Sequence, residues 1–333
     1  MKLAVGFITY NETSAKYLAD FLPSLRTALG FLSLDDYQIY VWDNSPADSR
    51  LNHDALENFN KQTALIDGPL IKYFTTGVNL GYGCAYNRLI NEAVADCAEY
   101  FLIINPDTIL EPETISELIK ALDDNHNLGS VSPKIKRWDF ANRTKTNIID
   151  SVGLILKPGL RFFDLGAGEE DRNQFNQATI IGPSGAAGLF RFSALTDIAA
   201  KQRPDQKPQY FDEQFFMYKE DCDLAYRLFL AGYASRLVDT ALVYHDRTAA
   251  SSGTGMGKII SDRRAKDKQI RAWSFRNQHL IFVKHWKKQN FVSRLLIISY
   301  SLAFLIFSLI LEQFLLKEYY YILRYRSVLT NTK

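Results

Sequence analysis

Short apolar runs alternate with amphipathic stretches over the first 135 residues of the chain. The apolar runs predict strands at 2–8, 37–42, 70–75 and 100–104, and the stretches between and after them predict helices at 14–32, 86–97 and 111–124. Strands separated by helices indicate right-handed βαβ units, which build a parallel sheet covered on both faces. The pattern therefore predicts a doubly wound, mostly parallel α/β fold.

The pattern changes after residue 135. Short β-like runs at 148–156, 178–181 and 189–192 are separated by glycine turns, and helices are expected at 193–201 and 220–231, with short strands at 236–238 and 242–244. The stretch 249–257 contains only Ser, Thr, Gly, Ala and one Met, which suits either a mobile lid or a disordered connection. A long helix is predicted at 259–286.

The C-terminal region is apolar and flanked by bases. Residues 295–311 form a run of 17 residues without a charge, at the lower limit for a helix that spans a bilayer. Arg294, Ser301 and Ser308 recur every seven residues, and such a polar stripe favours a helix that lies in the membrane interface or packs against a partner. Trp286 and Tyr319–Tyr321 would anchor it at headgroup depth. A helix packed on the body, or a homo-oligomer interface, remains the alternative.

Charge divides the chain in the same place. The 333 residues hold 39 Lys and Arg against 37 Asp and Glu, but residues 284–333 carry eight bases and two acids, which leaves a net −4 for the rest. An acidic body with a basic, apolar tail argues against a nucleic-acid binder and favours an anionic membrane surface. The three cysteines lack any CxxC spacing, and no signal peptide is evident, so we expect the cytoplasmic face of the cell membrane, with a monotopic or single-span attachment through 291–316.

Polar clusters follow three of the predicted strands. They are Thr9, Tyr10, Asn11 and Glu12 after the first, Asp43 and Asn44 after the second, and Asn105, Pro106 and Asp107 after the fourth. Ligands of parallel sheets bind beyond the carboxyl ends of the strands, so we expect one shared crevice. Neither a dinucleotide nor a Walker glycine motif is present. Each cluster taken alone is also compatible with an ordinary turn or helix cap.

Three further features carry candidate chemistry. A glycine loop enters a helix between Asn79 and Asn87, where the backbone can approach a phosphate or sugar, although a helix-entry loop without a ligand has the same pattern. Glu220, Asp221 and Asp223 begin a helix behind an aromatic run, and a carboxylate among aromatic rings becomes a stronger base, although acids also favour helix starts on dipole grounds. His245 ends a short strand and could ligate Mg²⁺ or Mn²⁺ if it faces Asp107; a lone His is otherwise most often structural.

Over residues 1–285 the order and spacing of these motifs resemble the inverting glycosyltransferases of family 2, with the GT-A fold. Within that family they look most like bacterial rhamnosyltransferases of cell-surface polysaccharide synthesis. The matching residues are Thr9 to Glu12, Asp43 to Ser45, Asn79 to Gly83 with Asn87, Asn105 to Asp107, Gly185 to Gly188, Glu220 to Arg227, His245, and Arg276 with Asn277. The resemblance implies a GT-A domain at 1–258, with a nucleotide-sugar half at about 1–135 and an acceptor half at about 136–258. A linking helix at 259–290 and a membrane-associated tail at 291–333 would follow.

The resemblance also implies roles for individual residues. The donor-binding set would be Thr9, Tyr10, Asn11, Glu12, Asp43, Asn79, Gly81, Asn87, Asn105 and Asp107. Asn105 stands in the first acidic position of the family's D-x-D motif, which leaves Asp107 as the certain carboxylate ligand of a divalent cation, with His245 as the late metal ligand. Asp221 would be the general base. Gly185, Gly188 and Glu220 would border the acceptor, and we add Arg247 or Arg276 as candidates for the departing diphosphate.

The function expected from the sequence is inverting transfer of a sugar, with dTDP-rhamnose favoured as donor, to a glycan acceptor carried on a polyprenyl diphosphate. Two alternatives remain open at this point. One is a transferase of the same fold that uses a UDP-hexose or a UDP-N-acetylhexosamine. The other is a membrane-associated scaffold without catalysis, against which the joint presence of Asp107, Asp221 and His245 argues.

Overall fold

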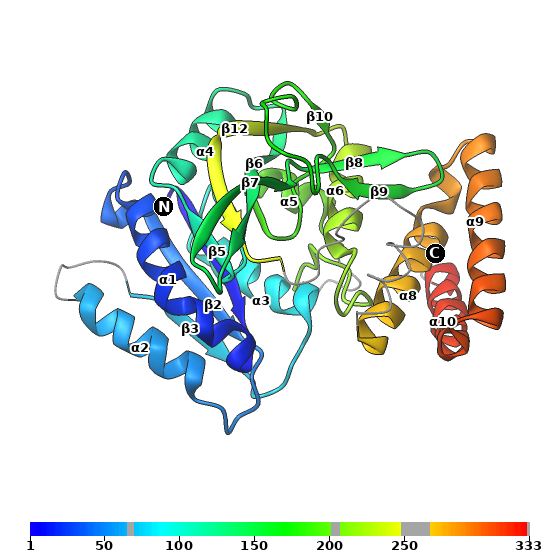
Figure 1. Ribbon diagram of the computed structural model, residues 1–333, viewed down its shortest axis with the longest axis horizontal. Helices are drawn as coiled ribbons and strands as arrows, with labels where there is room; N and C mark the ends of the chain where they lie inside the picture. The colour runs from blue at the N-terminus through cyan, green and yellow to red at the C-terminus, as the bar shows by residue number, and fades with distance from the viewer. Residues whose placement is uncertain (65–69, 201–206, 248–266, 332–333) are drawn as a thin grey trace.

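A computed structural model describes residues 1–64, 70–200, 207–247 and 267–331 of the chain (Figure 1). The strands are β1 (Leu3–Thr9), β2 (Tyr37–Asp43), β3 (Lys72–Thr75), β4 (Tyr100–Ile104), β5 (Thr108–Leu110), β6 (Leu128–Asp139), β7 (Thr144–Ser151), β8 (Leu154–Lys157), β9 (Arg161–Asp164), β10 (Thr179–Ile180), β11 (Ala187–Arg191) and β12 (Ala234–His245). The helices are α1 (Asn11–Leu29), α2 (Leu51–Ala64), α3 (Tyr82–Ala95), α4 (Thr114–Asp123), α5 (Phe192–Ile198), α6 (Glu220–Leu230), α8 (Lys268–His285), α9 (Phe291–Ile310) and α10 (Glu318–Asn331).

The N-terminal half confirms the predicted parallel sheet. Strands β3, β2, β1 and β4 lie side by side in that order and run parallel. Their apolar side chains form two cores, one on each face of the sheet. Phe7 packs edge-on against Phe21 of α1, with ring centroids 5.0 Å apart, while Tyr86 of α3 packs on Phe101 from the other side. The pairing sets Thr9 beside Asp43, so two of the predicted polar clusters end at the same edge.

Beyond β4 the sheet is mixed, which differs from the mostly parallel sheet expected. β11 runs antiparallel to both β4 and β6, β12 runs parallel to β6, and β5 and β10 pair antiparallel with β12. The predicted strands 236–238 and 242–244 are parts of the single strand β12, whose pairing with β6 shifts register between Val238 and Leu242.

Strand β6 shows why its segment gave no clear strand pattern in the sequence. It contains Lys134, whose side chain is buried although lysine usually lies at the surface. The ammonium bonds to Asp171, Asn173 and Asn176, at 3.0 to 3.3 Å. A charged residue inside a buried strand hides the apolar pattern, and its partners lie far along the chain.

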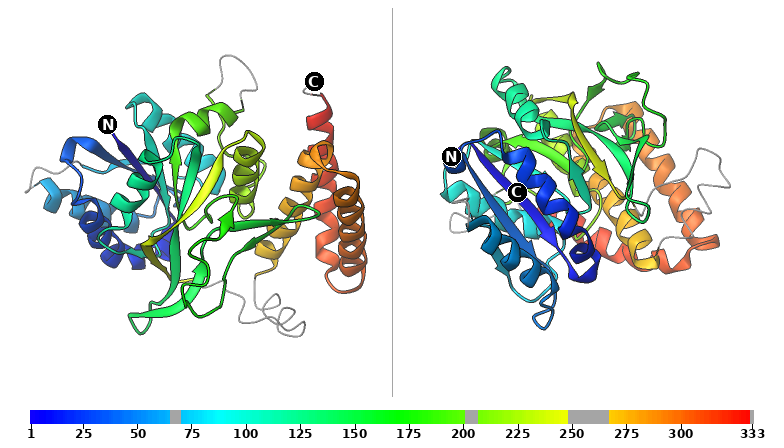
Figure 2. Two further views of the ribbon diagram at one scale, coloured as in Figure 1. Left: turned by 90° about the horizontal axis from the view of Figure 1, so that it is seen from above. Right: turned by 60° about the vertical axis from the view of Figure 1, so that its left-hand side comes forward.

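Helices α8, α9 and α10 form a separate layer at the end of the molecule opposite α2 (Figure 1; Figure 2). Phe275 of α8 packs on Phe304 of α9 and Tyr319 of α10, with ring centroids 5.8 and 5.5 Å apart. Arg271 of α8 also pairs with Glu312 at 2.6 Å. The described part of the predicted helix 259–286 begins at Lys268, capped by Asp267, while the predicted loop 249–257 lies outside the described residues.

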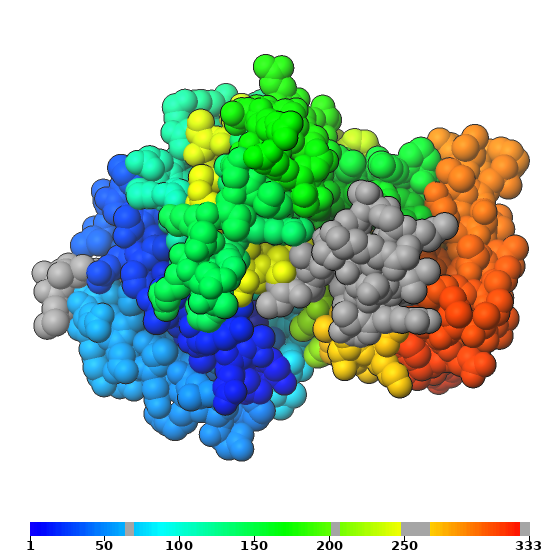
Figure 3. All heavy atoms as spheres, viewed as in Figure 1, coloured from blue at the N-terminus to red at the C-terminus, as the bar shows by residue number. Residues whose placement is uncertain are grey.

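Helix α9 packs on the body along one side, where Ser293, Ile297 and Ser308 are buried, and most of its exposed side chains are apolar. Figure 3 shows α9 at one edge of the molecule. The exposed apolar residues of α9 are Phe291, Val292, Leu295, Ile298, Leu302, Leu305, Ile306, Leu309 and Ile310. Within the described residues, α9 is the one helix long and apolar enough to cross a membrane, with a mean hydropathy of 2.0. Of the predicted stripe, Ser308 is buried and Arg294 and Ser301 are half-buried, while large apolar side chains of the helix are exposed.

Candidate active site

A cavity of about 560 Å³ lies beyond the carboxyl ends of β1 and β4 and is bounded on its far side by α6 and α8. The predicted site residues that line it are Tyr10, Asn79, Asn105, Asp107, Gly185, Glu220, Asp221, His245 and Arg247. Residues from both halves of the chain therefore meet in one crevice, as the strand ends predicted.

Asp107 and His245 meet at one end of the cavity. β5 pairs with the end of β12, setting Thr108 opposite His245, and this leaves Asp107 Oδ2 3.3 Å from His245 Nε2. The other oxygen, Asp107 Oδ1, is buried without a hydrogen-bond partner among the described residues. Burial alone would lower the pKa of His245, but the carboxylates of Asp107 and Asp150 outweigh it and raise that pKa to about 10. A carboxylate beside an imidazole, with one oxygen unsatisfied, is a donor set that fits a divalent cation.

Asp150 orients this histidine and had no signal in the sequence. Its Oδ2 lies 2.9 Å from His245 Nδ1, so the ring presents Nε2 to Asp107, the arrangement that a carboxylate behind a ligating histidine provides. Arg247 donates to Asp150 at 3.2 Å and to Asp164 at 3.0 Å. Arg247 therefore lines the cavity as predicted, but its guanidinium is engaged by two carboxylates, and its role toward a diphosphate stays a prediction.

Asp221 and Glu220 lie at the start of α6, on another wall of the cavity. Asp221 Oδ2 accepts from the Gly185 N–H at 3.0 Å, and Oδ1 accepts from the Cys222 N–H at 2.7 Å. Burial, with the negative charge of Asp164, raises the pKa of Asp221. Burial and the charge of Asp221 likewise hold the pKa of Glu220 well above its ordinary range. A carboxylate whose pKa is raised accepts a proton more readily, which is what a general base requires.

A strained turn precedes α6 and is held by α8. Tyr218 and Lys219 both have positive φ angles, of 73° and 74°, which non-glycine residues adopt only when their surroundings enforce it. The fully buried Asn277 donates from Nδ2 to the carbonyls of Met217 and Tyr218, at 2.8 and 2.7 Å. Its neighbour Arg276 does not line the cavity.

Arg276 instead turns toward α10. Its Nη1 lies 3.7 Å from Glu318, and its guanidinium lies over the ring of Tyr321. Arg276 Nε also donates to Asn277 Oδ1 at 3.5 Å, so the two members of the predicted Arg-Asn pair are in contact although they reach different elements. Asn277 supports the site, and Arg276 joins two helices of the C-terminal layer.

Several predicted donor residues support the cavity walls without lining the cavity. Asp43 is buried and accepts from the hydroxyls of Ser45 and Tyr73, at 2.6 and 2.7 Å. Asn87 is buried and bonds the backbone of Tyr210 and Phe211. The remaining predicted residues that do not line the cavity are Thr9, Asn11, Glu12, Gly81 and Gly188. Their roles toward a donor stay predictions.

Gly81 shows a backbone requirement directly. Its φ is +79°, and a Cβ there would lie 2.3 Å from the carbonyl oxygen of Phe216. The glycine at position 81 therefore allows the start of α3 to pack closely against the turn before α6. This packing requires glycine whether or not the loop also approaches a phosphate.

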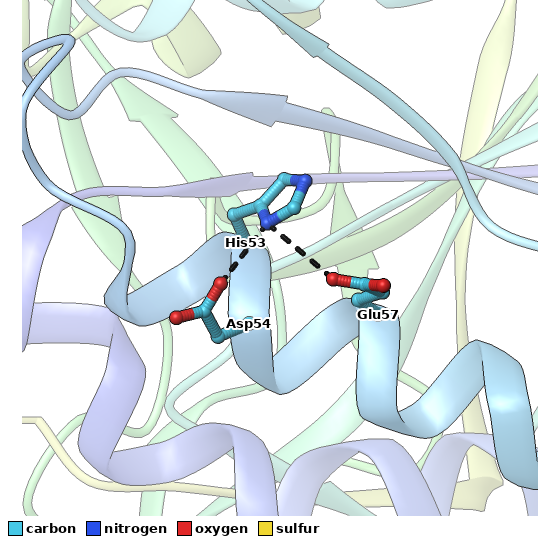
Figure 4. A group of neighbouring side chains, drawn as sticks. All are labelled: His53, Asp54 and Glu57. Carbon is cyan, nitrogen blue, oxygen red and sulfur yellow. Dashed lines mark hydrogen bonds and ion pairs between the residues drawn. The ribbon is translucent and has the colours of Figure 1, made fainter.

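A second group of possible metal ligands lies on α2, away from the cavity. His53, Asp54 and Glu57 gather on the surface of the helix, and the two acids are exposed (Figure 4). None of the three was predicted as a site residue, and an exposed acidic group of this kind is common without a metal.

The sheet, the Asp107–His245 pair and the carboxylates at the start of α6 together define a glycosyltransferase of the GT-A fold. The chain belongs to glycosyl transferase family 2, whose model matches residues 4–198. It is similar to the N-acetylglucosaminyl-diphospho-decaprenol L-rhamnosyltransferase of Mycobacterium tuberculosis, in two strains. The identity is 30% over 268 residues, which cover 75% of this chain and 78% of the relative.

The GalNAc-T7 structure supports the fold. The structure of GalNAc-T7 with UDP, GalNAc and Mn²⁺ superposes with a TM-score of 0.54 and 11% identity, over 87% of this chain and 51% of that one. S. aureus TarS 1–349 is also similar, with a TM-score of 0.47 and 17% identity, over 85% of this chain and 72% of that chain.

Proposed function

We propose that this glycosyltransferase moves L-rhamnose from dTDP-rhamnose to a sugar carried on a polyprenyl diphosphate, with inversion at the anomeric carbon. The proposed identities of the donor and the acceptor rest on the 30% identity to the mycobacterial rhamnosyltransferase, which extends through most of both chains. The cavity supports the reaction type because Asp221, our candidate base, and the candidate metal pair Asp107 and His245 line the same crevice.

A single displacement needs no nucleophile from the enzyme. Asp221 takes the proton of the acceptor hydroxyl as that oxygen attacks the anomeric carbon, and the nucleoside diphosphate leaves from the opposite face. Asp107 and His245 would hold a Mg²⁺ or Mn²⁺ ion, which supplies positive charge to the leaving diphosphate. Asp150 keeps the His245 ring oriented, and Asn277 keeps the start of α6 in place.

The donor is tested by a panel of sugar nucleotides with the purified full chain, with and without Mn²⁺. We expect transfer from dTDP-rhamnose to a short-prenyl diphosphate N-acetylglucosamine. NMR of the product should show the anomeric configuration opposite to that of the donor. Thermal-shift measurements should rank dTDP-rhamnose above UDP-glucose and UDP-N-acetylglucosamine. Preferential transfer from a UDP-sugar, or retention of the donor configuration, contradicts the proposal.

The exposed face of α9 supports attachment to a lipid surface. The body covers the inner side of this helix from Ser293 to Ser308, so the helix lies along the protein and offers its apolar side outward. Lys287, Lys288 and Lys317 flank it at both ends, which suits anionic headgroups. We therefore propose a helix that lies in the interface of the cytoplasmic leaflet, beside the lipid-carried acceptor.

Carboxylates placed on this face should release the protein from membranes. We expect Ile298→Glu with Leu302→Glu to weaken binding to anionic vesicles by at least about 100-fold, because two apolar side chains leave the lipid. Cosedimentation measures this, and thermal unfolding shows whether the fold is kept. Leu51→Glu with Val78→Glu, at exposed apolar positions on the body, is the matched control and should bind normally. Vesicle binding that survives in the α9 variant rules this face out as the anchor.

A further inference from the structure

Two side chains outside the predicted motifs line the cavity on its acceptor side. Asp164 comes from β9 and Trp273 comes from α8. The negative charge of Asp164 acts on Asp221, so the two carboxylates share one part of the cavity. Trp273 lies outside residues 4–198, the segment that the family model matches.

Asp164 presents an oriented hydrogen-bond acceptor. Its Oδ2 accepts from Arg247 Nη2 at 3.0 Å, which fixes the carboxylate plane, and its side chain is 21% exposed. Among the described residues, Oδ1 of Asp164 has no hydrogen-bond partner. This oxygen can therefore accept a hydrogen bond from a hydroxyl group.

Trp273 presents a rigid aromatic wall. Its ring packs against Phe216, with the ring centroids 4.9 Å apart and the planes inclined by 41°. The Phe216 carbonyl accepts from the Tyr82 N–H at 2.8 Å, and Asn277, one helical turn after Trp273, holds the carbonyls that follow Phe216. Both the ring and its support are therefore fixed before any ligand arrives.

An aromatic wall and a hydrogen-bonding carboxylate in the same cavity suit a pyranose. The axial C–H bonds of such a sugar form an apolar face that packs on an aromatic ring, while its equatorial hydroxyls extend sideways toward polar groups. We propose that Trp273 and Asp164 form the acceptor-sugar subsite, with Trp273 as the platform for the ring and Asp164 as the acceptor for one of its hydroxyls. This inference rests on the proposed function and names the residues that select its acceptor.

The two elements that carry this subsite also contact α9. The turn between β8 and β9 reaches α9 where the Gly159 N–H donates to Ser293 Oγ at 3.1 Å. On α8, Phe275 lies two residues beyond Trp273 and packs against Phe304 of α9. The subsite is thus joined to the helix with the exposed apolar face, which is the side from which a lipid-carried sugar would arrive.

The test measures acceptor and donor use separately, with the full chain and a short-prenyl diphosphate N-acetylglucosamine as acceptor. We expect Trp273→Ala and Asp164→Asn each to raise the acceptor KM by about tenfold or more. For Trp273→Ala the donor Kd and the slow hydrolysis of donor without acceptor should stay within about twofold, because Trp273 is not at the Asp107–His245 end. Trp273→Phe, which keeps an aromatic face, should recover most of the acceptor affinity.

Phe163→Ala is the matched control, because Phe163 lies beside Asp164 on the same strand and does not line the cavity. Its acceptor KM should equal that of the wild type. An unchanged acceptor KM in both variants, alongside normal wild-type transfer, overturns the subsite alone. A wild-type protein that neither hydrolyses nor transfers from any sugar nucleotide overturns the proposed function and the subsite with it.

Discussion

Asp221→Asn is expected to lower the rate of sugar transfer by roughly 10²–10⁴-fold and to leave the donor Kd within about twofold. The amide keeps the shape of the side chain and can still accept from the Gly185 N–H, but it cannot take a proton. Single-turnover transfer, with donor binding by calorimetry, separates the two effects. The wild-type rate should also fall as pH decreases through the raised pKa of Asp221, since protonation removes the base.

The charges around Asp221 set the direction of that pH profile. Asp164 raises its pKa, while Lys219 and the N–H groups of Gly185 and Cys222 lower it, and burial tips the balance upward. Loss of the Asp164 charge should therefore move the acid limb of the rate profile to lower pH.

Glu220→Gln is the matched control for Asp221→Asn. Glu220 adjoins Asp221, lines the same cavity and has a pKa well above its ordinary range, so a neutral amide resembles the form that burial favours. We expect a loss of less than about tenfold. Transfer that survives in Asp221→Asn and disappears in Glu220→Gln would move the base to Glu220.

The sequence predicted the strands of the N-terminal part of the fold well because they are short, apolar and buried on both faces. The predicted strand 100–104 matches β4 at both ends, and Thr9 and Asp43 end their strands side by side. The sheet after residue 127 was harder to predict, because β6 contains charged residues whose partners come from distant loops. Pairing between β6, β11 and β12 depends on long-range contacts that local periodicity does not record.

The same division applies to the site. Asp107, Asp221 and His245 were found from motifs, and the structure brings all three into one cavity. Asp150 and Asp164 are single acids in β-rich segments, where no spacing marks them, and their contacts with His245 and Arg247 appear only in the folded structure. Asn277 was part of a motif, but its contact with the turn at Met217 and Tyr218 could not be inferred from spacing.

The tail illustrates a different limit. The heptad spacing of Arg294, Ser301 and Ser308 predicted a polar stripe, yet it did not tell which way the stripe faces. In the structure Ser308 is buried and donates to the carbonyl of Phe304, one turn earlier in α9, while Arg294 and Ser301 are half-buried. The apolar face then points outward by geometry, because helix sides opposite one another cannot both contact the same partner.

Asp107→Asn is expected to reduce Mn²⁺-dependent transfer by at least about 10³-fold, the size of effect that loss of a metal clamp on a leaving diphosphate produces. Asp107 has one oxygen beside His245 and one buried without a partner among the described residues, so a cation would satisfy both. The amide removes the negative charge while preserving the volume. Mn²⁺ affinity, measured by titration calorimetry, should fall together with the rate.

The surface group on α2 provides the control for this experiment. His53→Ala with Glu57→Gln dismantles the other cluster of possible ligands without touching the cavity (Figure 4). We expect the transfer rate and the Mn²⁺ dependence of this variant to match the wild type, because no residue of α2 lines the cavity. Normal Mn²⁺ binding in Asp107→Asn, or its loss in the α2 variant, would move the metal from the strand ends to the surface. The two variants therefore decide where the cation acts, as well as whether one is needed.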